Sequence, residues 1–170
     1  MRFDLATDGP ILDRTPTVLR ALLQGLDQGW THANYGDGTW SPVQIVAHYL
    51  HNDLTDWVPR LEWIIDHGEE PFAPYDPQGN VAFESLSLDA LLDQFADARQ
   101  ASMSRLRSLL TPEVLRLHGT HPAFGRVSVE QLLAAWVVHD LHHIGQLAKA
   151  MAHQHRDEVG PWRAYLSVLG

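Results

Sequence analysis

The 170-residue sequence contains no cysteine. This absence excludes disulfide bonds, thiolate metal ligands and a cysteine nucleophile, so any thiol chemistry needs a thiol supplied as substrate. Basic residues are also scarce, because 12 Lys and Arg stand against 21 Asp and Glu and give a net charge of −9. Nucleic-acid backbones are bound by clustered Lys and Arg, so the sequence predicts no nucleic-acid partner.

Long apolar runs and targeting signals are lacking as well. No apolar stretch approaches the roughly 18 residues that cross a bilayer, and residues 1–10 contain an early acid and no apolar core of a signal peptide. We therefore expect no membrane partner and a cytoplasmic location. Hydrophobic residues make up 45% of the chain, as in ordinary globular proteins, so residues 1–170 are expected to form a single domain.

Apolar residues recur with helical spacing in four long segments, and strand patterns are sparse. The segments span residues 15–26, 41–68, 87–110 and 128–153. Ser41 and Ser128 each precede a Gln by three residues, which is the pattern of a capping box, and Pro59 is expected to interrupt or bend the second segment. Residues 68–86 form a long Pro- and Gly-rich connection between the second and third helices. The pattern predicts an all-α four-helix bundle.

Two further segments carry local signals. Residues 119–126 are predicted to form a compact, turn-rich loop. Residues 160–169 are predicted to form a last short helix packed by Trp162, Tyr165 and Leu166. Most of the six tryptophans are expected in core or interface packing and not in an aromatic substrate wall.

Three histidines fall within five positions of the last helical segment: His139, His142 and His143. At about 3.6 residues per turn, His139 and His143 share one face of the helix and can hold one metal ion. His48 lies among apolar residues of the second segment, where a core-facing side chain is expected, and is the natural third ligand. Three neutral imidazoles leave coordination positions open to water or substrate, as in catalytic sites. Zn, Ni, Fe(II) and Mn can all be held this way, and the ligand set alone does not choose between them. Of these divalent metals, we favour Zn or Ni.

Other interpretations of these residues stay open. A buried His pair is also compatible with hydrogen bonding in the core, and eleven histidines make chance pairs more common. His142 is turned by about 100° from His143 and is placed at the rim, while His51 is a spare ligand or hydrogen-bond donor. Asp140 and His142 are the candidates for a catalytic role, to orient a ligand or shuttle a proton. The metalloprotease motif His-Glu-x-x-His does not match, because Asp140 replaces Glu and Lys149 occupies the position of the third His.

The chain resembles the DinB/YfiT-like superfamily of helical-bundle proteins in three stretches, residues 40–48, 119–146 and 160–166. The resemblance covers nearly the whole chain. It implies a four-helix bundle in a variant of the up-and-down topology. It also implies a divalent-metal triad made of one His from the second helix and a His-x-x-x-His pair from the last, which correspond to His48, His139 and His143.

The resemblance implies a metal-dependent enzyme without determining its reaction. Characterised members include thiol S-transferases that use bacillithiol and mycothiol-dependent isomerases, and several members are dimers. We therefore expect a small-molecule substrate, favour a low-molecular-weight thiol, and consider a homodimer. Three hypotheses follow: a thiol S-transferase, which is favoured, a metal-dependent hydrolase that activates water, and a non-enzymatic metal-binding stress-response protein.

Overall fold

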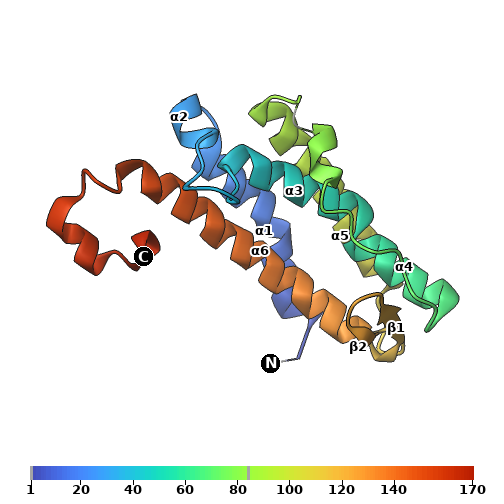
Figure 1. Ribbon diagram of the computed structural model, residues 1–170. Coiled ribbons are helices and arrows are strands. Elements are labelled where there is room, and N and C mark those ends of the chain that lie inside the picture. The colour runs from blue at the N-terminus through green and yellow to red at the C-terminus, as the bar shows by residue number, and fades with distance from the viewer. Residues whose placement is uncertain (1, 84) are drawn as a thin grey trace.

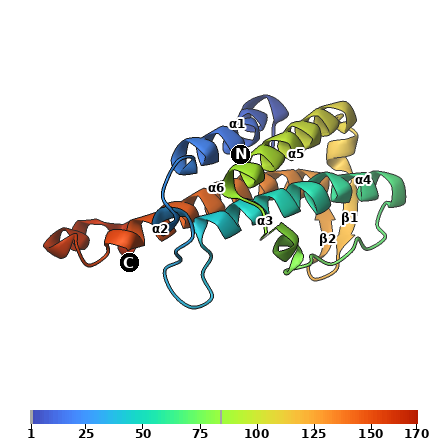
Figure 2. The ribbon, with the colours of Figure 1, turned by 90° about the horizontal axis from the view of Figure 1, so that it is seen from above.

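Four helical positions make up a bundle in the computed structural model, which describes residues 2–83 and 85–170 (Figure 1). They are occupied by α1 (Leu5–Leu23), α3 (Pro42–Thr55) with its continuation α4 (Trp57–His67), α5 (Leu88–Leu109) and α6 (Val129–Ala152). The short α2 (Gln28–Thr31) lies in the first connection. Seen from above, α1 and α5 form one side of the bundle and α3 and α6 the other (Figure 2). The predicted four-helix bundle is confirmed.

The first helix differs from its prediction at both ends. A helix over residues 15–26 was predicted, but α1 begins after Asp4, whose side chain caps it, and ends at Leu23. Pro10 and Pro16 lie inside this helix. Proline lacks the N–H of a helical hydrogen bond and is favoured in the first turn of a helix, so Thr15-Pro16 is easily read as the helix start. The structure shows that the helix continues through both of them.

The signals for helix ends in the second and fourth segments are confirmed. Ser41 and Ser128 each close a capping box at the start of α3 and of α6. The second segment divides at Asp56, three residues before Pro59. Pro59 cannot donate to the carbonyl of Thr55 and its ring crowds that carbonyl, which explains why the helix breaks here.

A β-hairpin replaces the loop that was predicted over residues 119–126. Strand β1 (His118–His121) pairs in antiparallel fashion with β2 (Gly125–Ser128). Gly125 has a φ of 73°, a left-handed conformation that closes a three-residue turn. The loop prediction was wrong because strands of four residues carry too few alternating positions to be recognised among turn residues.

The C-terminal segment leaves the bundle beyond the end of α6 (Figure 1). It forms short 3-10 turns over His153–His155, Gly160–Tyr165 and Ser167–Leu169. The predicted last short helix is present as a 3-10 helix over Gly160–Tyr165. Trp162 and Tyr165 are 70% and 88% exposed, and Leu166 is also exposed, so the prediction that these side chains pack the helix was wrong. The segment is held by the buried side chain of Leu169 and by Lys149, which donates to the last backbone carbonyl.

The apolar core is divided into two clusters by a polar layer in the middle of the bundle. One cluster lies toward the hairpin and contains Trp57 and Trp136, and the other contains Tyr49 and Phe95. Buried polar residues from all four bundle positions lie between them: Thr15, His48, Asn52, Asp53, Arg99, Asp140 and His143. A buried polar layer needs internal partners for its charges, so this layer is the place to look for a functional site.

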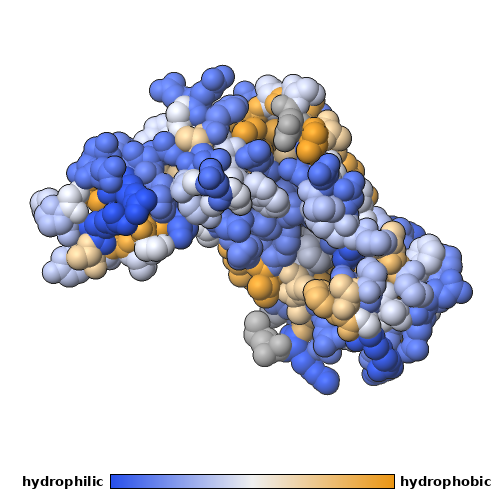
Figure 3. Space-filling model, viewed as in Figure 1, coloured by the Kyte–Doolittle hydropathy of each residue, from blue (hydrophilic) through white to orange (hydrophobic). Residues whose placement is uncertain are grey.

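The surface visible in Figure 3 is mostly hydrophilic, with apolar side chains gathered beside α6 and around the start of α5. Among the described helices, none combines the length and the apolar character needed to cross a bilayer.

Candidate metal centre

The structure brings the three predicted metal ligands together. The Nε2 atoms of His48 on α3 and His139 on α6 lie 3.0 Å apart, and the rings of His48 and His143 have centroids 4.5 Å apart. One ligand atom from each of the three residues lies within 4.8 Å of the others. Within the part of the chain that the structure describes, no other group of three His, Asp or Glu side chains meets this criterion.

Two of these rings are oriented through their outer nitrogen atoms. Gln146 Oε1 lies 2.7 Å from His143 Nδ1. An amide oxygen only accepts, so Nδ1 of His143 donates and its Nε2 keeps a lone pair for the cluster. The hydroxyl of Tyr75, in the long connection, lies 3.0 Å from His48 Nδ1. Neither partner was predicted, although Gln146 follows His143 by three residues and therefore lies one helical turn away.

His139 faces a carboxylate through its outer nitrogen. Its Nδ1 is buried without a hydrogen-bond partner in the described part of the chain, and Asp140 Oδ1 lies 3.8 Å away. Asp140 is fully buried, and it accepts from Arg99 Nη1 at 2.5 Å and from the Thr15 hydroxyl at 2.6 Å. The structure therefore places Asp140 behind His139, facing the outer nitrogen of its ring, and not at the open side of the cluster.

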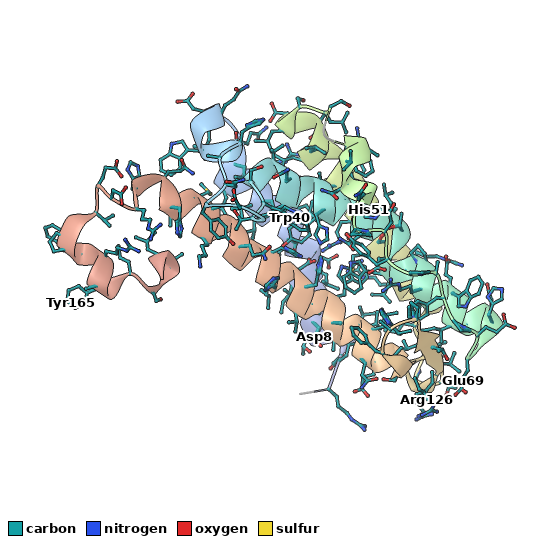
Figure 4. The ribbon with its side chains drawn as sticks, in the orientation of Figure 1. Asp8, Trp40, His51, Glu69, Arg126 and Tyr165 are labelled. Carbon is teal, nitrogen blue, oxygen red and sulfur yellow. The ribbon has the colours of Figure 1, made fainter. Side chains whose placement is uncertain are left out.

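The two other histidines near the cluster lie outside it. His142 is exposed, and its ring centroid is 5.0 Å from that of His143, which places it at the rim. His51 is buried, but its ring packs against Tyr75 and its Nε2 lies 3.5 Å from the hydroxyl of Thr55. Figure 4 labels Trp40 near the start of α3 and His51 farther along this helix. Neither residue completes the triad.

Burial keeps His48 and His143 neutral. The pKa of His48 is lowered to about 3, first by burial and then by the neighbouring His143 and His139. The pKa of His143 is lowered to about 4 by burial and by the charge that His139 would carry. A neutral imidazole is the form that binds a metal ion, so His48 and His143 are ready to bind a cation near neutral pH.

Arg99 on α5 joins all four bundle positions beside the cluster. It donates to Asp53 through Nε and Nη2 at 2.6 and 2.9 Å, and to Asp140 through Nη1 and Nη2 at 2.5 and 3.2 Å. Its fifth N–H donates to the carbonyl of Leu12 at 2.8 Å. This carbonyl is available because Pro16, four residues later, has no N–H to occupy it. All five donors of the guanidinium are thus satisfied.

Two buried carboxylates, Asp53 and Asp140, surround the one guanidinium of Arg99, and burial raises the pKa of Asp53. Burial opposes ionisation, but the charge of Arg99 outweighs it and the pKa of Asp140 is lowered. Asp140 is adjacent to His139 in the chain and faces its ring. The ionised carboxylate of Asp140 at this place favours a cation on the histidines, since Coulomb interactions are strong away from water.

Aromatic rings cover the cluster. The ring of Trp40 lies 4.6 Å from that of His48 and 5.7 Å from that of His143, between α3 and α6 (Figure 4). The ring of Trp57 meets His139 edge-on at 5.0 Å. The His139 side chain remains 19% exposed, whereas His48 and His143 are buried. The cluster is therefore most accessible at His139.

The donor set fits a divalent cation. Zn–N bonds of about 2.0–2.1 Å at a tetrahedral angle place two imidazole nitrogens about 3.3 Å apart, close to the 3.0 Å between His48 and His139. Zn, Ni, Fe(II) and Mn all accept imidazole ligands. Three residues supply the ligand atoms, which leaves further coordination positions for water or a substrate.

Comparisons with known proteins agree with this architecture. The family model of the DinB superfamily matches residues 11–147, a span that contains all three histidines. The chain belongs to the DinB superfamily. A search of curated proteins finds no match to this DinB-superfamily chain.

Two solved structures share the fold of this DinB-superfamily protein. YfiT from Bacillus subtilis, a probable metal-dependent hydrolase with an unusual four-helix bundle topology, is 18% identical with a TM-score of 0.73, over 92% of this chain and 90% of YfiT. TT2238, a four-helix bundle protein, is 21% identical with a TM-score of 0.58, over 86% of this chain and 100% of TT2238. At these identities the likeness establishes the four-helix bundle fold.

We expect Gln146→Leu and Tyr75→Phe each to weaken divalent-metal binding by about 10- to 100-fold. Each substitution removes the outer hydrogen bond of one ligand ring and leaves all three imidazoles in place. Titration calorimetry of the metal-free protein with Zn²⁺ and Ni²⁺ measures the effect. Gln94→Leu and Tyr165→Phe are matched controls on exposed positions, and affinities equal to theirs would contradict the orienting role.

Proposed function

We propose that the protein is a divalent-metal-dependent enzyme that transfers a low-molecular-weight thiol to a small electrophile. When bound, a divalent cation lowers the pKa of a coordinated thiol or water and so supplies a nucleophile at neutral pH. His48, His139 and His143 hold the cation. The chain contributes no thiol of its own, because it has no cysteine.

The main support for this proposal is that the acids near the triad are already paired with arginine side chains. Three buried carboxylates lie near His139: Asp53 and Asp56, whose pKa values are raised by burial, and Asp140, whose pKa is lowered by the charge of Arg99. Asp53 and Asp140 form ion pairs with Arg99, and Asp56 forms one with Arg60 at 2.6 Å. No carboxylate among these three is free to take a proton from water as a general base.

This arrangement favours a thiol over water. A thiol has a pKa of about 8.5, close to neutrality, and needs only modest stabilisation to lose its proton. Water, with a pKa of about 15.7, needs a much larger shift or a general base. In the proposed reaction the thiol releases its proton to solvent, its sulfur forms a bond to the electrophilic carbon, and the leaving group departs with the electron pair. No oxidant or reductant is required.

A metal-dependent hydrolase is the second candidate. Its support is the likeness in fold to YfiT, which is described as a probable metal-dependent hydrolase. The same triad would serve this reaction with water in place of the thiol. Substrate assays with and without a thiol separate the two candidates.

The test uses protein loaded with Zn²⁺ or Ni²⁺, 1-chloro-2,4-dinitrobenzene as electrophile, and bacillithiol, mycothiol, glutathione or coenzyme A as thiol. We expect thioether formation that requires both metal and thiol and is lost in His139→Ala. Hydrolysis of nitrophenyl esters without a thiol, in the absence of conjugation, would favour the hydrolase. Metal binding without either reaction would favour a non-enzymatic metal-binding role.

A further inference from the structure

A cavity of about 520 Å³ lies between α4, the hairpin and α6, and we name it the hairpin pocket. Its apolar walls are formed by Trp57, Phe72, Phe124, Val127, Leu132 and Ala135. Its size falls within the range of about 300–1,000 Å³ that is usual for small-molecule sites, which are also mainly apolar.

The hairpin pocket lies beside the exposed side of the metal centre. Ala135 precedes His139 by four residues, so both lie on one face of α6, about 6 Å apart along the helix axis. Trp57 lines the pocket and also contacts the ring of His139. His139 is the most exposed ligand of the triad. Trp57 is therefore the wall that the hairpin pocket shares with the triad.

The charged groups of the hairpin pocket are paired. Arg60 forms an ion pair with Asp56 at 2.6 Å, and Arg126 forms one with Glu69 at 3.0 Å. Figure 4 shows Arg126 and Glu69 together at the end of the hairpin. Because both guanidinium groups already have a carboxylate partner, the pocket does not select for an anion. The apolar walls and balanced charges suit a neutral ligand.

An aromatic pair stands at the rim of the hairpin pocket. Phe124 at the hairpin tip is 79% exposed, and its ring stacks on His121 with centroids 4.3 Å apart and planes 18° apart. His121 Nδ1 accepts from the backbone N–H groups of Ala123 and Phe124, which holds the turn. Phe72 meets His121 edge-on at 5.4 Å. An ordered, exposed aromatic pair offers a flat face for a second ring.

We infer that the hairpin pocket binds the aromatic or apolar body of a neutral electrophile and presents its reactive carbon to the metal centre. The reaction of that electrophile rests on the proposed function, but its binding does not. Phe124 and Ala135 are then residues that determine specificity. Each lies outside the metal triad, so substitutions there leave the metal site intact.

The test measures binding of 1,3-dinitrobenzene, a flat neutral molecule without a leaving group, to the metal-loaded protein. Ala135→Trp places a bulky ring in the pocket from an exposed position, and we expect its Kd to rise at least about 10-fold. Phe124→Ala removes the stacking partner and is expected to raise Kd by about 2- to 10-fold. Tyr165→Ala, at an 88% exposed aromatic position, is the matched control and should leave Kd unchanged.

Unchanged Kd values in both pocket variants, or tighter binding of 3,5-dinitrobenzoate than of the neutral probe, would overturn the inference. Metal content measured in the same samples keeps the two proposals apart. Loss of dinitrobenzene binding in the variants, with no thiol conjugation by the wild type, supports the pocket and contradicts the proposed reaction. If dinitrobenzene does not bind and Phe124→Ala converts a dimer into a monomer by light scattering, the face is an interface between copies and the inference is wrong.

Discussion

His48→Ala and His143→Ala are each expected to lower the affinity for divalent metal by about 100- to 1,000-fold. Each substitution removes one of the three ligands that supply the binding energy of the site. At stoichiometric metal concentration the purified variants should then carry almost no metal, whereas the wild type carries about one ion per chain. Elemental analysis and calorimetric titration with Zn²⁺ and Ni²⁺ measure these quantities.

His51→Ala and His142→Ala are the matched controls for this experiment. Both lie close to the triad in sequence and space, but His51 packs against Tyr75 and His142 lies at the exposed rim. We expect both to bind metal as the wild type does. Circular dichroism of all four variants checks that the helices are retained. Wild-type metal content in His48→Ala and His143→Ala would show that the assignment of the ligands is wrong.

Arg99→Met is expected to lower the free energy of unfolding by about 3–5 kcal/mol. Arg99 is 2% exposed and the side chains of Asp53 and Asp140 are fully buried, so the substitution leaves two carboxylates without their partner. It also leaves the carbonyl of Leu12 without a donor. Urea unfolding followed by circular dichroism measures the change.

Arg107→Met is the control for the loss of an arginine. Arg107 pairs with Asp13 at 2.5 Å, but the two side chains are 48% and 41% exposed. An exposed pair contributes about 0–1 kcal/mol, since water and salt screen it, so the expected loss is small. Equal destabilisation of Arg99→Met and Arg107→Met would show that the buried network does not hold the four helices together.

Local spacing predicted the parts of the fold that depend on one helix at a time. The capping boxes at Ser41 and Ser128 and the break before Pro59 follow from chemistry within one or two turns, and the structure confirms them. The hairpin was missed because its strands have four residues each, too few for a period to emerge. The start of α1 was missed because Pro16 after Thr15 resembles the first turn of a helix, whereas the helix begins at Leu5 and continues through Pro10 and Pro16.

The residues of the metal centre also divide into those that local spacing can predict and those that it cannot. His139 and His143 were predicted from a four-residue spacing, and Gln146 could have been found from its three-residue spacing to His143. Arg99 could also have been found, because it shares a helix face with the buried Phe95 and Met103 at a spacing of four residues. A buried charge on such a face requires buried partners of opposite charge. Tyr75 offered none, since its position in an irregular connection has no period.

The sequence by itself determined which side chains share a helix face and where most of the helices begin and end, because these follow from the fixed geometry of one helix. Only the tertiary structure decided which faces meet. The approach of His48 to His139 across 91 positions, the pairing of Arg99 with two acids, and the hairpin pocket beside the triad all depend on packing between distant segments. Packing of this kind is selected by the whole set of core contacts, which no local spacing records.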